Sequence, residues 1–327
     1  MQIQDILKER IMIIDGAMGT MIQRHTLSEE DFCGNLKGLT KSQKGNNDLL
    51  SITQPDIIRE IHTQYLEAGA DIIETNTFSS NAISMADYNL QSYVYELNFQ
   101  SAKIAKECAE LITAKNPSKP RFVAGALGPT NKTASLSPDV NNPGYREVGF
   151  MDLVKVYVEQ AKALIDGGVD MLLVETVFDT LNCKAALFAL NSLIEELNIK
   201  IPIMVSGTIT DASGRTLSGQ TTEAFYISIA HADLLSVGLN CALGASQMRP
   251  FLASLSKIAN CFVSCYPNAG LPNEFGQYDE SAEAMALSIK DFCENGFVNL
   301  VGGCCGTTPE HIAAIAAVAR KYKPRKF

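Results

Sequence analysis

Two adjacent cysteines near the C-terminus are the residues best suited to chemistry. Residues 301–307 read VGGCCGT, so Cys304 and Cys305 stand side by side among glycines. Two thiolates on one zinc ion lie less than about 4 Å apart, because each Zn–S bond is about 2.3 Å long. Neighbouring side chains on a regular strand point to opposite faces and could not both reach one ion. Glycine adopts dihedral angles forbidden to other residues, so we expect a kink that turns both thiols toward one point.

Cys241, in the sequence LNCALG, is the candidate for a third sulfur ligand. Three thiolates without a fourth protein ligand are typical of a catalytic zinc site with one open position. Such a zinc ion is a weak Lewis acid, but it can deprotonate and hold an incoming thiol. Free alkyl thiols, with a pKa near 8.5, are mostly protonated at neutral pH, so coordination would supply the nucleophile. The residues therefore predict alkylation of a substrate sulfur.

The remaining cysteines suit packing better than metal binding. Cys261 and Cys265 are roughly 13 Å apart if they share a strand that rises about 3.3 Å per residue. Cys33 lies in a long loop, and three more fall on expected helices as buried small residues, namely Cys108, Cys183 and Cys293. The competing interpretation of Cys304 and Cys305 is that they are merely small residues in a tight turn.

A second group of residues predicts an amino-acid site. In DGAMGT, Asp15 can accept a hydrogen bond from an ammonium group, and the backbone N–H groups of Gly16, Ala17 and Met18 can turn inward around a carboxylate. An ordinary Asp-Gly turn is the alternative. Glu175, in VETVFD, offers a second carboxylate, and Ser206 is a weaker candidate for substrate contact. Glu74, Thr75 and Asn76 are expected to form a hydrogen-bonded shell that supports the site.

Eight strand-helix units position these residues. Apolar runs, each followed by a loop and a helical segment, occupy 11–20, 70–78, 121–130, 169–179, 201–211, 233–244, 261–270 and 299–308. Such continuous runs indicate strands buried on both faces, and eight units favour a single-domain (βα)8 TIM barrel over an open doubly wound sheet. The candidate residues end these runs, where such barrels carry function. Residues 21–53 are too long for an ordinary loop and are expected to form a lid or hairpin.

Composition excludes several classes of protein. With 46% hydrophobic and 19% charged residues, the 327-residue chain is expected to be globular throughout. Its net charge of −9 argues against nucleic-acid and membrane partners. An odd count of nine cysteines and a charged, amphipathic start favour reduced thiols in the cytoplasm. No two of the four histidines are spaced to share a metal, which argues against a metal-dependent hydrolase.

Long motifs resemble one known family. DGAMGTMIQ, ADIIETNTF, VDMLLVETVFDTLN, VSGTITDASGRTLSGQ, YPNAGLPN and VGGCCGTTPEHI are similar, in this order, to the homocysteine-binding module of cobalamin-dependent methionine synthases. The resemblance implies that Cys241, Cys304 and Cys305 hold Zn²⁺ and that the thiolate of L-homocysteine takes the fourth place. It further implies that Asp15 and Glu175 receive the amino group and residues 16–18 the carboxylate. The resemblance also implies that Asn268 occupies the zinc when substrate is absent.

The resemblance also concerns the methyl donor. In that family, methylcobalamin delivers the methyl group, and further modules bind cobalamin and methyltetrahydrofolate. We therefore expect these modules or subunits as partners, and we expect this chain to be a fragment or one subunit of a split enzyme. Homocysteine methyltransferases that use betaine or S-methylmethionine share the GGCC chemistry and are one alternative; a non-catalytic thiol or zinc binding module is another.

Overall fold

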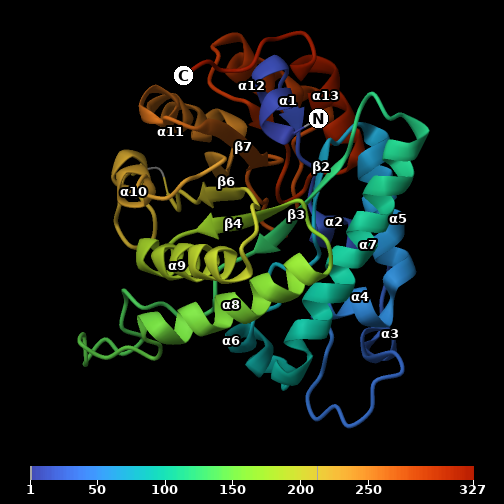
Figure 1. Ribbon diagram of the computed structural model, residues 1–327, viewed down its shortest axis with the longest axis vertical. Coiled ribbons are helices and arrows are strands. Elements are labelled where there is room, and N and C mark those ends of the chain that lie inside the picture. The colour runs from blue at the N-terminus through green and yellow to red at the C-terminus, as the bar shows by residue number, and fades with distance from the viewer. Residues whose placement is uncertain (1, 212) are drawn as a thin grey trace.

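Eight parallel strands form the centre of the computed structural model, which describes residues 2–211 and 213–327 (Figure 1). The hydrogen-bonded order is β1-β8-β7-β6-β5-β4-β3-β2. A parallel bridge between Ile14 and Ile72 joins the two ends of that order, and the N–H of Asp15 donates to the carbonyl of Ile72 at 3.0 Å. The sheet is therefore a closed barrel, which confirms the (βα)8 prediction. The strands are β1 (Met12–Ile13), β2 (Ile72–Glu74), β3 (Phe122–Leu127), β4 (Met171–Val177), β5 (Ile203–Gly207), β6 (Ser236–Gly244), β7 (Phe262–Asn268) and β8 (Leu300–Val301).

Helices surround the barrel and alternate with the strands (Figure 1). The outer layer consists of α5 (Pro55–Ala68), α7 (Val94–Lys115), α8 (Phe150–Asp166), α9 (Thr180–Leu197), α10 (Thr222–Ile229), α11 (Ala245–Ile258), α12 (Ala282–Glu294) and α13 (Pro309–Ala319). Shorter elements are α1 (Ile3–Glu9), α2 (Met18–Ile22), α3 (Glu29–Cys33), α4 (Leu50–Thr53), α6 (Ala82–Met85), and the 3-10 turns η1 (Asn47–Leu49), η2 (Ala86–Tyr88) and η3 (Gln91–Tyr93). In the described part of the chain, every helix is too short or too polar to cross a membrane.

Both faces of the strands are buried, as the continuous apolar runs predicted. Side chains such as Ile13, Ile73 and Val205 pack outward against the helices. Side chains that point inward, including Met12 and Met171, fill the barrel and contact α1. The interior is therefore a packed core, and polar chemistry is confined to the strand ends.

The expected helix boundaries are also observed. Gly69 ends α5 with a φ of 119°, in the left-handed region that glycine adopts readily. Thr308 caps α13 in a reciprocal arrangement with His311, whose Nδ1 lies 3.3 Å from the N–H of Thr308. Pro309 then starts the helix, because its missing N–H would have had no partner there.

The long insertion at 21–53 forms helices rather than a hairpin. Figure 1 shows α3 and α4 beside one end of α5 and α7. Ser28 and Asp31 form a capping box that starts α3. The carboxylate of Glu29 then accepts from Ser42 Oγ at 2.6 Å and from the N–H of Gln43 at 2.7 Å, which fixes the following loop. These local hydrogen bonds favour helical turns over strand pairing.

Candidate metal and substrate site

The three cysteines singled out in the sequence lie together at the carboxyl ends of the strands. The sulfur atoms of Cys241, Cys304 and Cys305 are all within 4.8 Å of one another, and those of Cys241 and Cys305 are 3.9 Å apart. Two ligands on a tetrahedral zinc ion with Zn–S bonds of about 2.3 Å are about 3.8 Å apart. The spacing and the all-sulfur donor set therefore fit zinc.

Two different backbone features bring the sulfurs together. Gly306 has a φ of 80°, and an added Cβ would overlap Tyr278. Gly303 is equally confined, because a Cβ there would strike the side chain of Thr307. The predicted glycine turn is thus observed. Cys241 and Ala242 have φ values of 61° and 59°, and this left-handed pair shifts the register between β6 and β7. A bulge of non-glycine residues directs Cys241, and no local sequence pattern predicts it.

Hydrogen bonds among the three cysteines give their thiol groups different pKa values. Contacts with Cys241 and then Cys305, together with burial, raise the pKa of Cys304 well above that of an ordinary thiol. Donation from Cys241 and then Cys304 lowers the pKa of Cys305 to about 3. The three thiol groups are therefore not equally acidic. A bound dication would allow all three sulfurs to ionise, because it compensates their mutual repulsion.

Neighbouring residues hold the cysteine turn in place. Asn268 Oδ1 accepts from the N–H of Cys305 at 3.1 Å, and the N–H of Cys304 donates to the carbonyl of Pro267 at 2.8 Å. Asn240 binds Thr176 through both amide atoms, at 3.1 and 2.8 Å, and its Nδ2 lies 4.0 Å from Cys304 Sγ. Asn240 thus links the turn to the residue that follows Glu175.

Tyr278 is a site residue that sequence reasoning missed. It lies on the loop between β7 and α12, covers Gly306, and its phenol contributes to lowering the pKa of Cys305. Loop tyrosines are common in sequences and carry no spacing signal. Only the folded loop, held by a bridge between Pro272 and Tyr278, places the ring beside the sulfurs.

The DGAMGT segment contacts the cysteine turn directly. The N–H of Gly303 donates to the carbonyl of Asp15 at 3.1 Å, and the N–H of Ala17 donates to Thr307 Oγ1 at 3.2 Å. Tyr65 donates its hydroxyl to the carbonyls of Ala17 and Thr307 at 3.1 and 3.0 Å. A Cβ on Gly16 would meet both Tyr65 and Thr307. The predicted carboxylate-binding segment and the predicted metal turn are therefore one connected structure.

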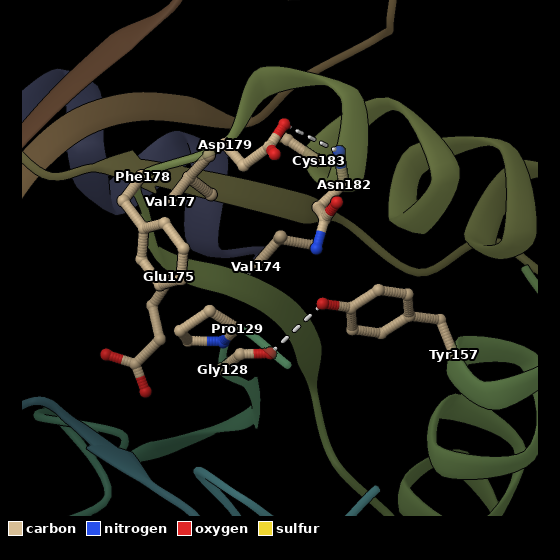
Figure 2. Close-up of a pocket in the computed structure, with 10 residues that line it drawn as sticks. All are labelled: Gly128, Pro129, Tyr157, Val174, Glu175, Val177, Phe178, Asp179, Asn182 and Cys183. Atoms are coloured by element: carbon tan, nitrogen blue, oxygen red, sulfur yellow. Dashed lines mark hydrogen bonds between the residues drawn. The ribbon is translucent and has the colours of Figure 1, made fainter. Parts of the chain in front are cut away.

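The predicted carboxylates also reach this end of the barrel. Asp15 and Glu175 are 3% and 5% exposed, and burial, followed by the charge of Glu74, raises the pKa of both groups well above the ordinary range. Figure 2 shows the Glu175 carboxylate directed away from Asp179 and Asn182, which line a cavity of about 10 Å³ behind it. That cavity holds at most one water, so it is not the substrate pocket.

The polar shell is observed only in part. Thr75 Oγ1 is 2.6 Å from Thr77 Oγ1, and Asn76 Nδ2 donates to the carbonyl of Asn47 at 2.8 Å, as expected of supporting residues. Glu74 differs, because its buried Oε1 has no hydrogen-bond partner among the described residues. Ser206 is fully buried, and its Oγ also lacks a partner in that part of the chain.

A closed (βα)8 barrel with a three-cysteine cluster at the carboxyl ends of its strands defines the class of protein: barrel proteins with a cysteine cluster that could hold a metal ion. Residues 12–319 match the family described as homocysteine S-methyltransferase, and the chain belongs to that family. The likeness noted in the sequence is thereby confirmed for the homocysteine methyltransferase module.

Solved structures agree on the fold. The metallated form of the homocysteine methyltransferase MmuM from Escherichia coli is 23% identical, with a TM-score of 0.72, over 95% of this chain and 97% of that chain. Its oxidized form is 22% identical over the same shares of the two chains, with a TM-score of 0.74. At this level of identity, the similarity shows a shared barrel.

Proposed function

We propose that this chain is a zinc-dependent methyltransferase that converts homocysteine to methionine. The observation that carries the proposal is the convergence of the Cys241, Cys304 and Cys305 sulfurs at the spacing of a tetrahedral site. When bound, zinc would supply the homocysteine sulfur as a thiolate at neutral pH. The protein's own task is to hold that sulfur where a methyl group can reach it in line.

The surrounding residues would orient the substrate. Asp15 and Glu175 are buried carboxyl groups with no cation among the groups that shift their pKa, so a bound ammonium group would favour their ionised form. The N–H of Ala17 is already bonded to Thr307, so the substrate carboxylate would be received by the N–H groups of Gly16 and Met18. Ser206 offers its unpartnered hydroxyl, and Asn268 sits behind Cys305, within the same site.

The methyl donor in this proposal is methylcobalamin, charged ultimately from 5-methyltetrahydrofolate and carried by another module or subunit. The long motifs shared with the cobalamin-dependent enzymes support this choice over betaine and S-methylmethionine. Assays of the zinc-loaded chain with each donor separately would decide the question. Turnover with betaine or S-methylmethionine, and none with free methylcobalamin, would overturn the choice of donor.

The ligand role is tested by Cys304→Ala, with Cys261→Ala as the matched control. Cys261 is also buried, but it precedes β7 at the opposite end of the barrel. We expect Cys304→Ala to lose most of its bound zinc and its methyl transfer, because two sulfurs do not complete the site. Cys261→Ala should retain both. Unchanged zinc content and rate in Cys304→Ala would remove the proposed ligand role.

X-ray absorption at the zinc edge separates an enzyme from a non-catalytic binding module. Adding homocysteine should introduce one new Zn–S contact if its thiolate enters the open position. An unchanged spectrum would instead favour a module that binds zinc without homocysteine. This measurement requires no methyl donor, so it is independent of the choice of cobalamin.

A further inference from the structure

Glu74 is a partly buried residue whose carboxylate oxygen Oε1 is buried without a hydrogen-bond partner in the described chain. It ends β2, and its backbone N–H donates to Asp15 Oδ2 at 3.1 Å. Its side chain, in contrast, lacks a partner: Oε1 is buried and accepts no hydrogen bond from the residues that the structure describes. A buried carboxylate oxygen without a donor is unfavourable by itself, so it points to a group that arrives from outside the protein.

Two further unpartnered atoms lie in the same part of the barrel. Ser206 and Tyr266, on β5 and β7, are 0% and 1% exposed; neither hydroxyl makes a hydrogen bond of good geometry within the described chain, although Ser206 is close enough to lower the pKa of Tyr266. The charges of Glu74 and Glu175 both contribute to raising the pKa of Tyr266, which places its hydroxyl near both carboxylates. The unpartnered side-chain atoms of Glu74, Ser206 and Tyr266 thus belong to one region of the barrel interior.

The electrostatics of this region favour a cationic ligand. Burial raises the pKa of Glu74 to about 7, and its charge also raises the pKa values of Asp15 and Glu175. No lysine, arginine or histidine is among the groups that shift these three carboxylates. A positive group bound between them would relieve the repulsion.

The number of donors on the substrate matches the number of carboxylates. An ammonium group has three N–H donors, and Asp15 and Glu175 would satisfy two of them. We propose that Glu74 is the third acceptor for the homocysteine ammonium, and that it makes the site selective for thiols that carry an α-amino group. This inference rests on the proposed function and adds a specificity-determining residue to it.

A Glu74→Gln substitution isolates this role. Glutamine has nearly the same shape and leaves the backbone hydrogen bond to Asp15 intact, so a purely structural role should survive it. The binding experiment uses zinc-loaded protein and calorimetry with two ligands: homocysteine, and 4-mercaptobutanoate, which lacks only the amino group. Asp48→Asn is the matched control, because Asp48 is a buried carboxylate that bonds instead to Ser79 and Ser80.

We expect wild-type protein to bind homocysteine more tightly than 4-mercaptobutanoate. Glu74→Gln should raise the Kd for homocysteine about tenfold or more and leave the Kd for 4-mercaptobutanoate nearly unchanged. The ratio of the Kd for 4-mercaptobutanoate to the Kd for homocysteine should therefore fall. Asp48→Asn should keep the wild-type ratio. Equal weakening of both ligands by Glu74→Gln, or no weakening of homocysteine, would overturn the assignment of Glu74.

A second variant covers the case in which Glu74→Gln folds poorly. Glu74→Asp keeps the negative charge and should retain part of the preference for homocysteine; complete loss or full retention of the wild-type ratio would count against a charge contact. Wild-type protein that binds neither ligand would refute the proposed function itself, a result distinct from an unchanged ratio in the variants.

Discussion

The two ends of the barrel treat buried charge in opposite ways. At the amino end, Asp71 is fully buried just before β2, and Arg10 and Lys119 lie 2.7 and 3.3 Å from its carboxylate. Its Oδ2 also accepts from the N–H of Ile13 at 2.9 Å. At the carboxyl end, Glu74 is the last residue of β2 and Asp15 lies two residues after β1, and no cation in the described chain is among the groups that shift their pKa values.

This contrast separates stability from binding. A buried carboxylate with two cations and a backbone donor belongs to the fold, because removing it would leave its partners uncompensated. A buried carboxylate without a cation destabilises the empty protein and is retained where a ligand supplies the missing charge. The same residue type therefore serves the fold at one end and the substrate at the other, as expected of (βα)8 barrels.

The largest effect should come from breaking the paired end. Asp71→Ala would leave Arg10 and Lys119 without their buried partner, and we expect a loss of about 3–5 kcal/mol in the free energy of unfolding. Urea denaturation measures this loss. The Kd for homocysteine of the protein that remains folded should not change. A weakened Kd without a loss of stability would contradict the division of the barrel.

A smaller effect, of the opposite kind, is expected at the unpaired end. Glu175→Gln should weaken homocysteine binding by about 2 kcal/mol, because a charge-assisted hydrogen bond to the ammonium becomes neutral. Its free energy of unfolding without ligand should stay equal or rise, since a buried, uncompensated carboxylate is removed. Calorimetry and urea denaturation on one preparation measure both quantities. Lower stability with unchanged affinity would place Glu175 in the fold rather than the site.

The smallest effect concerns pH. The pKa of Glu74 is raised to about 7 in the folded protein from 4.5, so the folded state holds its proton more tightly than the unfolded state. The stabilisation is fully present below about pH 4.5 and is lost as pH rises through 7. Wild-type protein should therefore lose about 1 kcal/mol more than Glu74→Gln between pH 6 and pH 7. Parallel stability curves for the two proteins over that range would contradict this account.

The order of the strands and helices was predictable because its signals are local. Continuous apolar runs indicate the strands. The helix boundaries are indicated by Gly69 after one helix and by Thr308 with Pro309 before another. The glycine turn around Cys304 and Cys305 was predictable for the same reason. The insertion at 21–53 was not, because the helices there depend on contacts such as Glu29 to Ser42.

The amino-acid sequence alone specifies which groups are present: eight strands with polar ends, three candidate sulfurs, and the acids Asp15 and Glu175. Their spatial arrangement depends on the folded barrel. The left-handed bulge at Cys241, the ring of Tyr278 over the cysteine turn and the unpartnered oxygen of Glu74 all arise from closure of the barrel. Closure joins residues up to about 290 positions apart, such as Ala17 and Thr307, and no local pattern encodes the distances between them.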